Sequence, residues 1–408
     1  MLRVLPIVAL ATATPVFAQE KPADTSGNTV VVTGVRLHDL QKNLDACLAR
    51  KCPPNEDISA TIKVAEQQFV DGKYADASVT LRKSLGRNRG FAKDYPVSVS
   101  YLYRASYRVA EHLGDADTYI TGVYGSLRSL KAGLAADDYR ILGADLEVGD
   151  MLVRFYRYHE AIDRYTLVEK RAAALGLLTV QGLARFRIVG LYSQLASHPP
   201  YRYKTEAKKA AAWLIDNPDP RMKPFGEAAR ITIAMLDAKT GDPGAVDRLI
   251  ANFRTDKSVK APILLYAPPY DYIEGDARAS SGGTVSDMEL VARQNFDGEW
   301  VDIDFWVGPD GHVSDVDVLR AGKKGTPTWI APIIKSIRGR RYAPLNMDAS
   351  APGVLRVERY TLTARVVDAS IGSHIPSREA TPQIETLDLS VDPTAAPDGS
   401  TKLQKAKQ

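Results

Sequence analysis

The sequence predicts a multidomain protein: an all-α solenoid of helical hairpins, followed by a small α+β domain of order β-β-α-β. The chain has 408 residues, 45% hydrophobic and 25% charged, which at roughly 150 residues per domain corresponds to two or three folded domains. From Ile58 to about Phe253, apolar residues recur with helical spacing between regular breaks. From Val301, apolar and acidic residues alternate, as in a strand with one buried face.

Residues 1–18 have the pattern of a secretory signal. A basic start is followed by the apolar stretch Val4 to Phe17, and small residues stand at Val16 and Ala18, where a signal peptidase reads. We therefore expect cleavage after Ala18 and export. The alternative is an uncleaved anchor, although the stretch is shorter than the ~20 residues that span a bilayer. The intact mass of the exported protein separates the two.

The two cysteines lie in the N-terminal leader, residues 19–57. Cys47 and Cys52 are followed by Pro53-Pro54, and an oxidising compartment favours a disulfide between them. On one continuous helix their Cα atoms would be too far apart, so the helix that begins near Leu37 is expected to end near Arg50. A zinc site is the alternative, but two thiols without nearby histidine do not complete a zinc shell.

Charge and hydropathy exclude two classes of protein. The formal net charge is only +4, and three lysines lie within the last seven residues, so we expect no nucleic-acid partner, which would need a concentrated basic surface. No run of 18 apolar residues occurs, so we expect no integral membrane segment after signal cleavage.

Residues 58–255 are assigned to the solenoid, with about ten helices. Ile58, Ile62, Ala65 and Phe69 form one apolar face before the break at Gly72. The spacing of Tyr74, Ala77, Leu81 and Ser84 then returns at Tyr158, Ala161, Tyr165 and Val168. The segment Gly72 to Ala77 resembles the turn and second-helix start of the tetratricopeptide repeat, which implies stacked helical hairpins.

Tyrosines are frequent in this region, and they suggest an aromatic groove for a peptide on the concave side. Tyr103 and Tyr107 are the candidates for partner binding. The alternative is that the tyrosines pack in the core with their hydroxyls at its rim. His112 and His159 are expected on helix surfaces. The tyrosines considered are Tyr101, Tyr103, Tyr107, Tyr119, Tyr124, Tyr156 and Tyr158.

Residues 256–285 are a Pro- and Gly-rich linker, in which Ile263 to Tyr266 could add an edge strand. In the sheet domain, residues 286–367, strands are expected around 301–307 and 313–318 and over Val354 to Val366. Between them lies a helix with an apolar stripe. Asp302 and Asp304 are expected to face solvent, so Asp302→Ala should be nearly neutral. The strand residues expected to face the stripe are Val301, Ile303, Phe305 and Val307, and the stripe is Trp329, Ile330, Ile333, Ile334 and Ile337.

Charge is segregated within this domain. Residues 297–317 contain acids and no Lys or Arg, whereas residues 318–347 contain bases and no acid, so the two blocks should offset each other. A divalent-cation site at Asp302, Asp304, Asp315 and Asp317 is the alternative to solvated strand faces, and we expect no metal or other cofactor. The Pro-, Ser- and Thr-rich tail, residues 368–408, is expected to be disordered.

The element order, with Pro309-Asp310-Gly311 in the turn and Tyr342-Ala343-Pro344 after the helix, resembles the C-terminal domain of TonB. The resemblance covers about Gln294 to Val366. It implies a periplasmic domain that captures partners by strand addition at a sheet edge, and it makes Arg356 and Tyr360 of the third strand candidates for partner binding. The membrane anchor and long proline-rich spacer of that family do not occur here.

Asn28 to Arg36 reads Asn-Thr-Val-Val-Val-Thr-Gly-Val-Arg and resembles the TonB box, through which outer-membrane receptors add a strand to TonB. Its β-branched residues favour an extended strand, which could pair with the chain's own sheet or with a second molecule. The alternative is a flexible leader or an unrelated edge strand. The candidate partner-binding residues are Val30, Val31, Val32, Thr33 and Gly34.

None of the common catalytic motifs occurs, neither HExxH nor a Walker loop, GxGxxG or GxSxG. The sequence therefore predicts a non-enzymatic periplasmic scaffold without a cofactor, whose partners are periplasmic or outer-membrane proteins and which is linked to TonB-dependent transport. The alternative is an atypical TonB-type energy transducer, held in the inner membrane by an uncleaved N-terminal segment.

Overall fold

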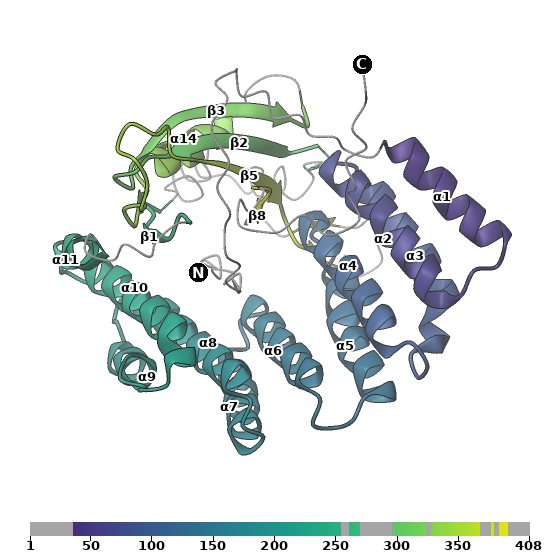
Figure 1. Ribbon diagram of the computed structural model, residues 1–408, viewed down its shortest axis with the longest axis horizontal. Coiled ribbons are helices and arrows are strands. Elements are labelled where there is room, and N and C mark those ends of the chain that lie inside the picture. Colours follow the sequence, from purple (N-terminus) through teal and green to yellow (C-terminus); the bar gives the residue numbers. More distant parts are fainter. Residues whose placement is uncertain are drawn as a thin grey trace.

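The computed structural model describes residues 36–253, 261–269, 296, 298–323, 328–367, 377–378 and 383–390. These residues form a helix-rich protein with a small antiparallel sheet in its C-terminal part (Figure 1). The expected order, helices first and sheet second, is confirmed at this level. Val30 to Gly34 lie outside the described residues. Among those described, none of the helices combines the length and the apolar character needed to cross a membrane.

Consecutive helices of the N-terminal part pack as hairpins. Ten of them, α2 to α11, match the expected number, and α1 packs on α2 in front of them. The expected boundary at residue 58 falls inside α2, so the solenoid begins earlier than the sequence indicated. The helices are α1 (Leu37–Ala49), α2 (Pro54–Val70), α3 (Tyr74–Asn88), α4 (Pro96–Leu113), α5 (Ala116–Gly133), α6 (Tyr139–Arg154), α7 (Tyr158–Ala174), α8 (Leu178–Ala196), α9 (Lys204–Ile215), α10 (Lys223–Lys239) and α11 (Ala245–Phe253).

The repeated spacing marks the buried face of α3 and α7. Ala77 and Ala161 are both fully buried, and their small side chains let neighbouring helices approach closely. At the turn between α2 and α3, Gly72 has a φ of +74°, and a Cβ there would overlap the Trp300 ring. Glycine at 72 therefore serves both the left-handed turn and the contact with the sheet domain.

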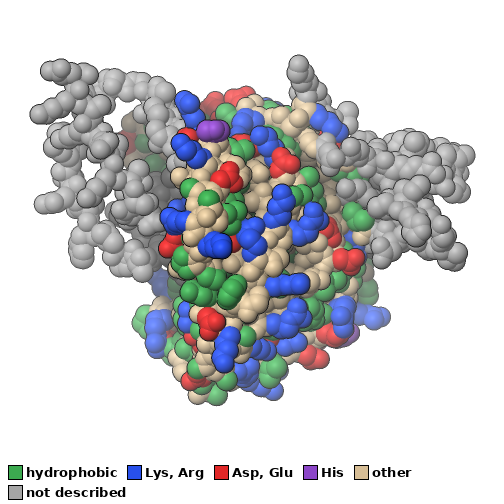
Figure 2. All heavy atoms as spheres, turned by 90° about the vertical axis from the view of Figure 1, so that its right-hand side faces the viewer, with side chains coloured by type: hydrophobic (Ala, Val, Ile, Leu, Met, Phe, Trp, Pro, Cys, Tyr) green, Lys and Arg blue, Asp and Glu red, His purple; other side chains and the backbone are tan. Residues whose placement is uncertain are grey.

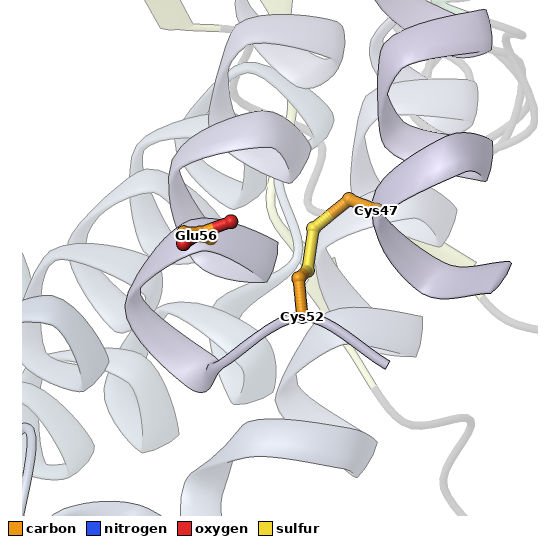
Figure 3. A group of neighbouring side chains, drawn as sticks. All are labelled: Cys47, Cys52 and Glu56. Atoms are coloured by element: carbon orange, nitrogen blue, oxygen red, sulfur yellow. A yellow bond between two sulfur atoms is a disulfide. The ribbon is translucent and has the colours of Figure 1, made fainter. Parts of the chain in front are cut away.

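The disulfide is present as predicted. Cys47, in the last turn of α1, is bonded to Cys52 with a Cα–Cα distance of 5.2 Å, and α1 ends at Ala49 as required. Figure 3 shows the bridge between α1 and the start of α2, with Glu56 nearby. Within the part of the chain that the structure describes, these three residues alone have the spacing of a metal site. Because both sulfurs belong to the disulfide, the group lacks free thiolate ligands.

We expect Cys47→Ser to lower the stability only modestly. The bridge closes a very small loop, and the loop-entropy formula gives about 2 kcal/mol for such a ring. The rest of the solenoid should stay folded, because α1 contacts the array at one end only. Urea unfolding of the variant and wild type measures the loss, and peptide mapping without reductant detects the bridge. Two free thiols in protein purified from the periplasm would contradict the assignment.

The main sheet has four antiparallel strands in the order β3-β2-β5-β8. The short strand predicted near Ile263 is present as β1, which pairs with β4. The third predicted strand ends at Thr363, and Val366 belongs to a separate short strand. The elements are β1 (Leu264–Tyr266), β2 (Trp300–Val307), β3 (Val313–Ala321), α14 (Ala331–Arg338), β4 (Arg341–Tyr342), β5 (Val354–Thr363), β6 (Val366–Val367), β7 (Ser377–Arg378) and β8 (Gln383–Asp388).

The disorder expected for the whole tail is wrong for β8. Its six residues pair with β5 from Glu358↔Asp388 to Thr363↔Gln383. The segment has no strict apolar alternation and follows Pro382, so its sequence gives only a weak strand signal. It forms a strand because the edge of β5 presents unpaired main-chain N–H and C=O groups, with which the segment can hydrogen-bond.

One face of the sheet packs on α14 in the predicted register. Val301, Ile303, Phe305 and Val307 are all fully buried and share a core with the helix stripe, in which Ile334 is half-buried. Pro332 lies in the first turn of α14, where its missing N–H leaves no helical hydrogen bond unmade.

The other face is covered by the solenoid at Asp302, and the expectation that Asp302 faces solvent is wrong. Asp302 is fully buried because this face of the sheet packs on the first helices of the solenoid. Asp304 is half-buried. Asp302→Ala is therefore not expected to be neutral. The sheet is the middle layer of three, between α14 and the solenoid.

The sheet domain contacts both ends of the solenoid. Its main core includes Val246, Leu249 and Ile250 of α11, whereas Trp300 belongs to the core of α2, α3 and α4. In Figure 1 the helices form a curve with α6, α8 and α10 on its inner side, and the sheet bridges the two ends of that curve. The two predicted domains thus form one closed unit.

Candidate partner-binding site

Arg359 of β5 joins the two domains. Its side chain is fully buried, and its Nε donates a hydrogen bond of 2.6 Å to Asp302. Its two terminal nitrogens also donate to the carbonyl oxygens of Phe69 and Val70, at 2.6 and 2.7 Å. These carbonyls lie at the C-terminus of α2, where helical partners are missing and cations are favoured. The guanidinium stacks on the Trp300 ring, 4.1 Å from its centre.

A second set of polar contacts lies beside this joint. Thr361 of β5 shares hydrogen bonds with the Tyr74 hydroxyl, at 3.0 Å, and with Nδ1 of His112, at 2.9 Å. The His112 ring packs edge-on against Phe69, at 4.7 Å. His112 is thus an interface residue and not the helix-surface residue expected from the sequence. Burial, with the positive charges of Arg359 and Arg154, lowers the pKa of His112 to about 3.

The depressed pKa predicts a loss of stability in acid. Between pH 6.5 and about 3, the unfolded chain binds a proton at His112 that the folded chain does not. The free energy of unfolding therefore falls as the pH drops below 6.5. Between pH 6.5 and 5 we expect a loss of up to about 2 kcal/mol from this group, at 1.36 kcal/mol per pH unit.

The variant His112→Gln isolates this effect in urea titrations at pH 6.5 and 5. Glutamine retains a polar group for Thr361 but does not titrate, so the variant should lose less stability over this range. Other titrating groups, Glu111 among them, are common to both proteins and cancel in the comparison. Equal losses in the two proteins would contradict a buried neutral His112.

The outer strand β8 also connects the sheet to the solenoid. Glu385 forms an ion pair with Arg154 of α6, and both side chains are largely buried. Arg154 also contacts Glu111 of α4 at 3.3 Å. The Arg365 guanidinium lies 4.6 Å from the Phe155 ring centre and donates to the carbonyl oxygen of Arg154 at 3.2 Å. Arg154 thus faces the acidic side chain of Glu385, and Arg365 contacts the backbone of Arg154.

Burial raises the pKa of Glu111 to about 7, and the Glu385 charge adds to the rise while the Arg154 charge opposes it. A cavity of about 20 Å³ lies beside these groups and is lined also by Gln383 of β8 and Tyr119. This is room for about one water molecule. The contact between β8 and the solenoid therefore includes a water-sized cavity beside the ion pair.

Further along the solenoid, charged side chains are paired with one another. Arg104 of α4 pairs with Glu147 of α6. Asp150 of α6 accepts hydrogen bonds from Arg187 of α8, at 2.8 Å, and from the Tyr165 hydroxyl, at 2.7 Å. Together with Arg154, these pairs continue from α4 across α6 to α8.

Only some of the tyrosines predicted to line a groove lie on the surface. Tyr107 and Tyr119 are buried and pack edge-on at 5.5 Å, so the core alternative holds for both. Tyr103 is half-buried and lies against Gly125, where a Cβ would overlap its ring. Tyr101 and Tyr156 are exposed. The sequence could not separate these positions, because inner and outer helices both carry tyrosine.

The two candidates on β5 face the α14 side. Tyr360 is fully buried, and its hydroxyl accepts a hydrogen bond of 2.8 Å from Arg340, so it is a core residue in this structure. Arg356 is half-buried and pairs with Asp388 of β8. Arg356 contacts the edge strand β8 through its side chain, whereas Tyr360 pairs with Thr386 of β8 through the main chain.

The predicted offset of acidic and basic blocks agrees with the ion pairs of the domain. Asp302 pairs with Arg320 as well as with Arg359, and Glu299 pairs with Lys323. With Asp302 buried between two arginines, the four-carboxylate cation site loses one of its proposed ligands.

The face formed by α1 to α3 shows how charge is distributed on the solenoid. In Figure 2, Lys and Arg side chains are scattered over it with Asp and Glu between them. They do not gather there into the single basic stripe that phosphate binding requires.

No protein-family model matches the chain, and the search of curated proteins finds no match either. The resemblances to the tetratricopeptide repeat and to the C-terminal domain of TonB therefore depend on the residues themselves.

Proposed function

We propose that this protein is a non-enzymatic periplasmic interaction scaffold, in which a tetratricopeptide-like solenoid and a TonB-like sheet form one closed unit. The proposed activity is capture of an extended segment of a periplasmic or outer-membrane protein by strand addition at β5. The disulfide is compatible with an oxidising compartment. The box-like residues 28–34 would link the scaffold to TonB-dependent transport.

One observation carries the proposal: β5 already accepts an added strand. The pairing with β8 covers six residues, and β8 is reached through a segment that lies outside the β-β-α-β unit. Main-chain hydrogen bonds of this kind depend little on sequence, while side chains at alternate positions select the partner. While β8 is bound, the β5 edge has no place for residues 28–34.

Photocrosslinking in the native host tests the proposal. A photoreactive amino acid at Val357 lies at the edge of β5, where the main chain contacts the residue Ser390 that follows β8, whereas one at Val79 lies on the exposed face of α3 and serves as the control. We expect the probe at Val357 to crosslink to one partner through an extended segment, identified by mass spectrometry, and the probe at Val79 not to do so. Folded protein that gives no adduct at Val357 would contradict strand capture.

A further inference from the structure

The strand β8 adds little to the hydrophobic core. All six of its side chains are half-buried or exposed, and Ile384 alone is part of the core between the sheet and α14. By contrast, β2 and β5 each contribute several fully buried residues. Replacing β8 by another strand would therefore cost little core packing, provided that the new strand supplies the same few contacts.

Those contacts follow the period of a strand. Ile384 and Asp388 lie on the α14 side, where Asp388 meets Arg356, and Glu385 lies on the solenoid side, where it meets Arg154. The main chain pairs with β5. The sheet thus supplies the backbone ladder and one cation, and the solenoid supplies a second cation.

Charge also favours an acidic occupant. Without Glu385, Glu111 is the one acid among the described residues that forms an ion pair with Arg154, and burial already raises the pKa of Glu111. An acid at the position of Glu385 completes the pairing, whereas a basic residue there would be repelled. Buried acceptors that pair with arginine are the strongest contributors to such selection.

From these contacts we propose that β8 is an internal ligand. It occupies the site of a partner strand and makes the contacts that the partner would make. That partner is an extended segment of the pattern apolar–acid–x–x–acid, recognised jointly by β5, Arg154 and Arg356. This inference rests on the proposed strand capture and adds to it the class of segment and its competition with the chain's own tail.

The test uses the full-length protein and a fluorescent peptide with the sequence of residues 381–390. In wild type, the tethered β8 competes with the peptide, so binding should be weak. Glu385→Lys places a cation beside Arg154 and favours release of β8. Because apparent affinity scales with the fraction of open sites, the peptide should bind at least about tenfold more tightly to this variant.

The matched control is Thr386→Lys, which introduces the same lysine side chain at an exposed position of the same strand. It should bind the peptide within about threefold of wild type, since Thr386 does not contact Arg154. A second peptide with Lys in place of the glutamate should bind Glu385→Lys at least about tenfold more weakly than the native peptide does, because Arg154 would repel it. Circular dichroism of each variant confirms that the solenoid is folded.

Equal affinity of the peptide for wild type, Glu385→Lys and Thr386→Lys would overturn the inference, and so would equal affinity of the two peptides for Glu385→Lys. A peptide that binds none of the proteins also overturns it. The proposed function is judged separately, by the crosslinks from Val357. If these adducts form but Glu385→Lys does not increase peptide affinity, strand capture stands and the proposal that β8 is an acidic internal ligand is wrong.

Discussion

Arg359→Ala should destabilise the protein by about 3–5 kcal/mol, the range found when one member of a buried ion pair is removed. The change leaves the carboxylate of Asp302 in a fully buried position, with Arg320 as its remaining cation. It also removes the donors to two carbonyl groups at the end of α2. Arg359→Lys should recover little, because an ammonium group does not reproduce the fork of the guanidinium.

Denaturation followed by two probes measures this effect. Three of the four tryptophans, Trp300, Trp306 and Trp329, belong to the sheet domain, so fluorescence reports mainly on that domain, whereas far-ultraviolet circular dichroism reports on the helices. In wild type the two transitions should coincide, because the domains share an interface. In Arg359→Ala the fluorescence transition should move to a lower urea concentration and separate from the circular dichroism transition.

Arg356→Ala is the matched control. It removes the same side chain from the same strand, but on the opposite face, where the ion pair with Asp388 is partly exposed. Such pairs contribute about 0–1 kcal/mol. If Arg359→Ala costs no more than Arg356→Ala, the buried joint does not hold the domains together. Asp302→Ala combined with Arg359→Ala should cost less than the sum of the single changes, since both break one contact.

The behaviour of Asp302 shows where sequence reasoning reaches its limit. Alternation of apolar and acidic residues in β2 correctly gave the register, because only one assignment buries Val301, Ile303 and Phe305. The same alternation cannot tell whether the polar face meets water or another domain. A buried acid needs a cation, but of the two arginines that pair with Asp302, the fully buried one, Arg359, is 57 residues away in sequence.

The candidate site was harder to predict than the fold for a similar reason. Helices, turns and the disulfide depend on local spacing, which a sequence displays directly. The strand β8 depends on the free edge of β5, and its contact Arg154 lies 231 residues from Glu385. The tyrosines are visible in the sequence, but their burial is not. The packing of neighbouring helices, and not the residue type, decides that Tyr107 is buried.

Phe305→Ala should cost about 3–5 kcal/mol, the range for deleting a buried aromatic ring. Phe305 is fully buried in the middle of β2. The centre of its ring lies 6.5 Å from the centre of the Tyr342 ring and 5.5 Å from the Arg340 guanidinium. Arg340 forms a buried ion pair with Glu358, so the cavity would also remove one wall of that pair. The sheet domain should therefore unfold at lower urea by tryptophan fluorescence.

Asp317→Ala is the control on the neighbouring strand. Asp317 lies on β3 and is exposed, so its change should stay within about 0.5 kcal/mol of wild type. Phe305→Leu should lie between the two, because leucine fills part of the space left by the ring. This order, Phe305→Ala least stable, then Phe305→Leu, then Asp317→Ala near wild type, follows from the observed register. A one-residue shift of β2 would bring Asp304 and Trp306 to the core face instead and would make Phe305→Ala the mild change.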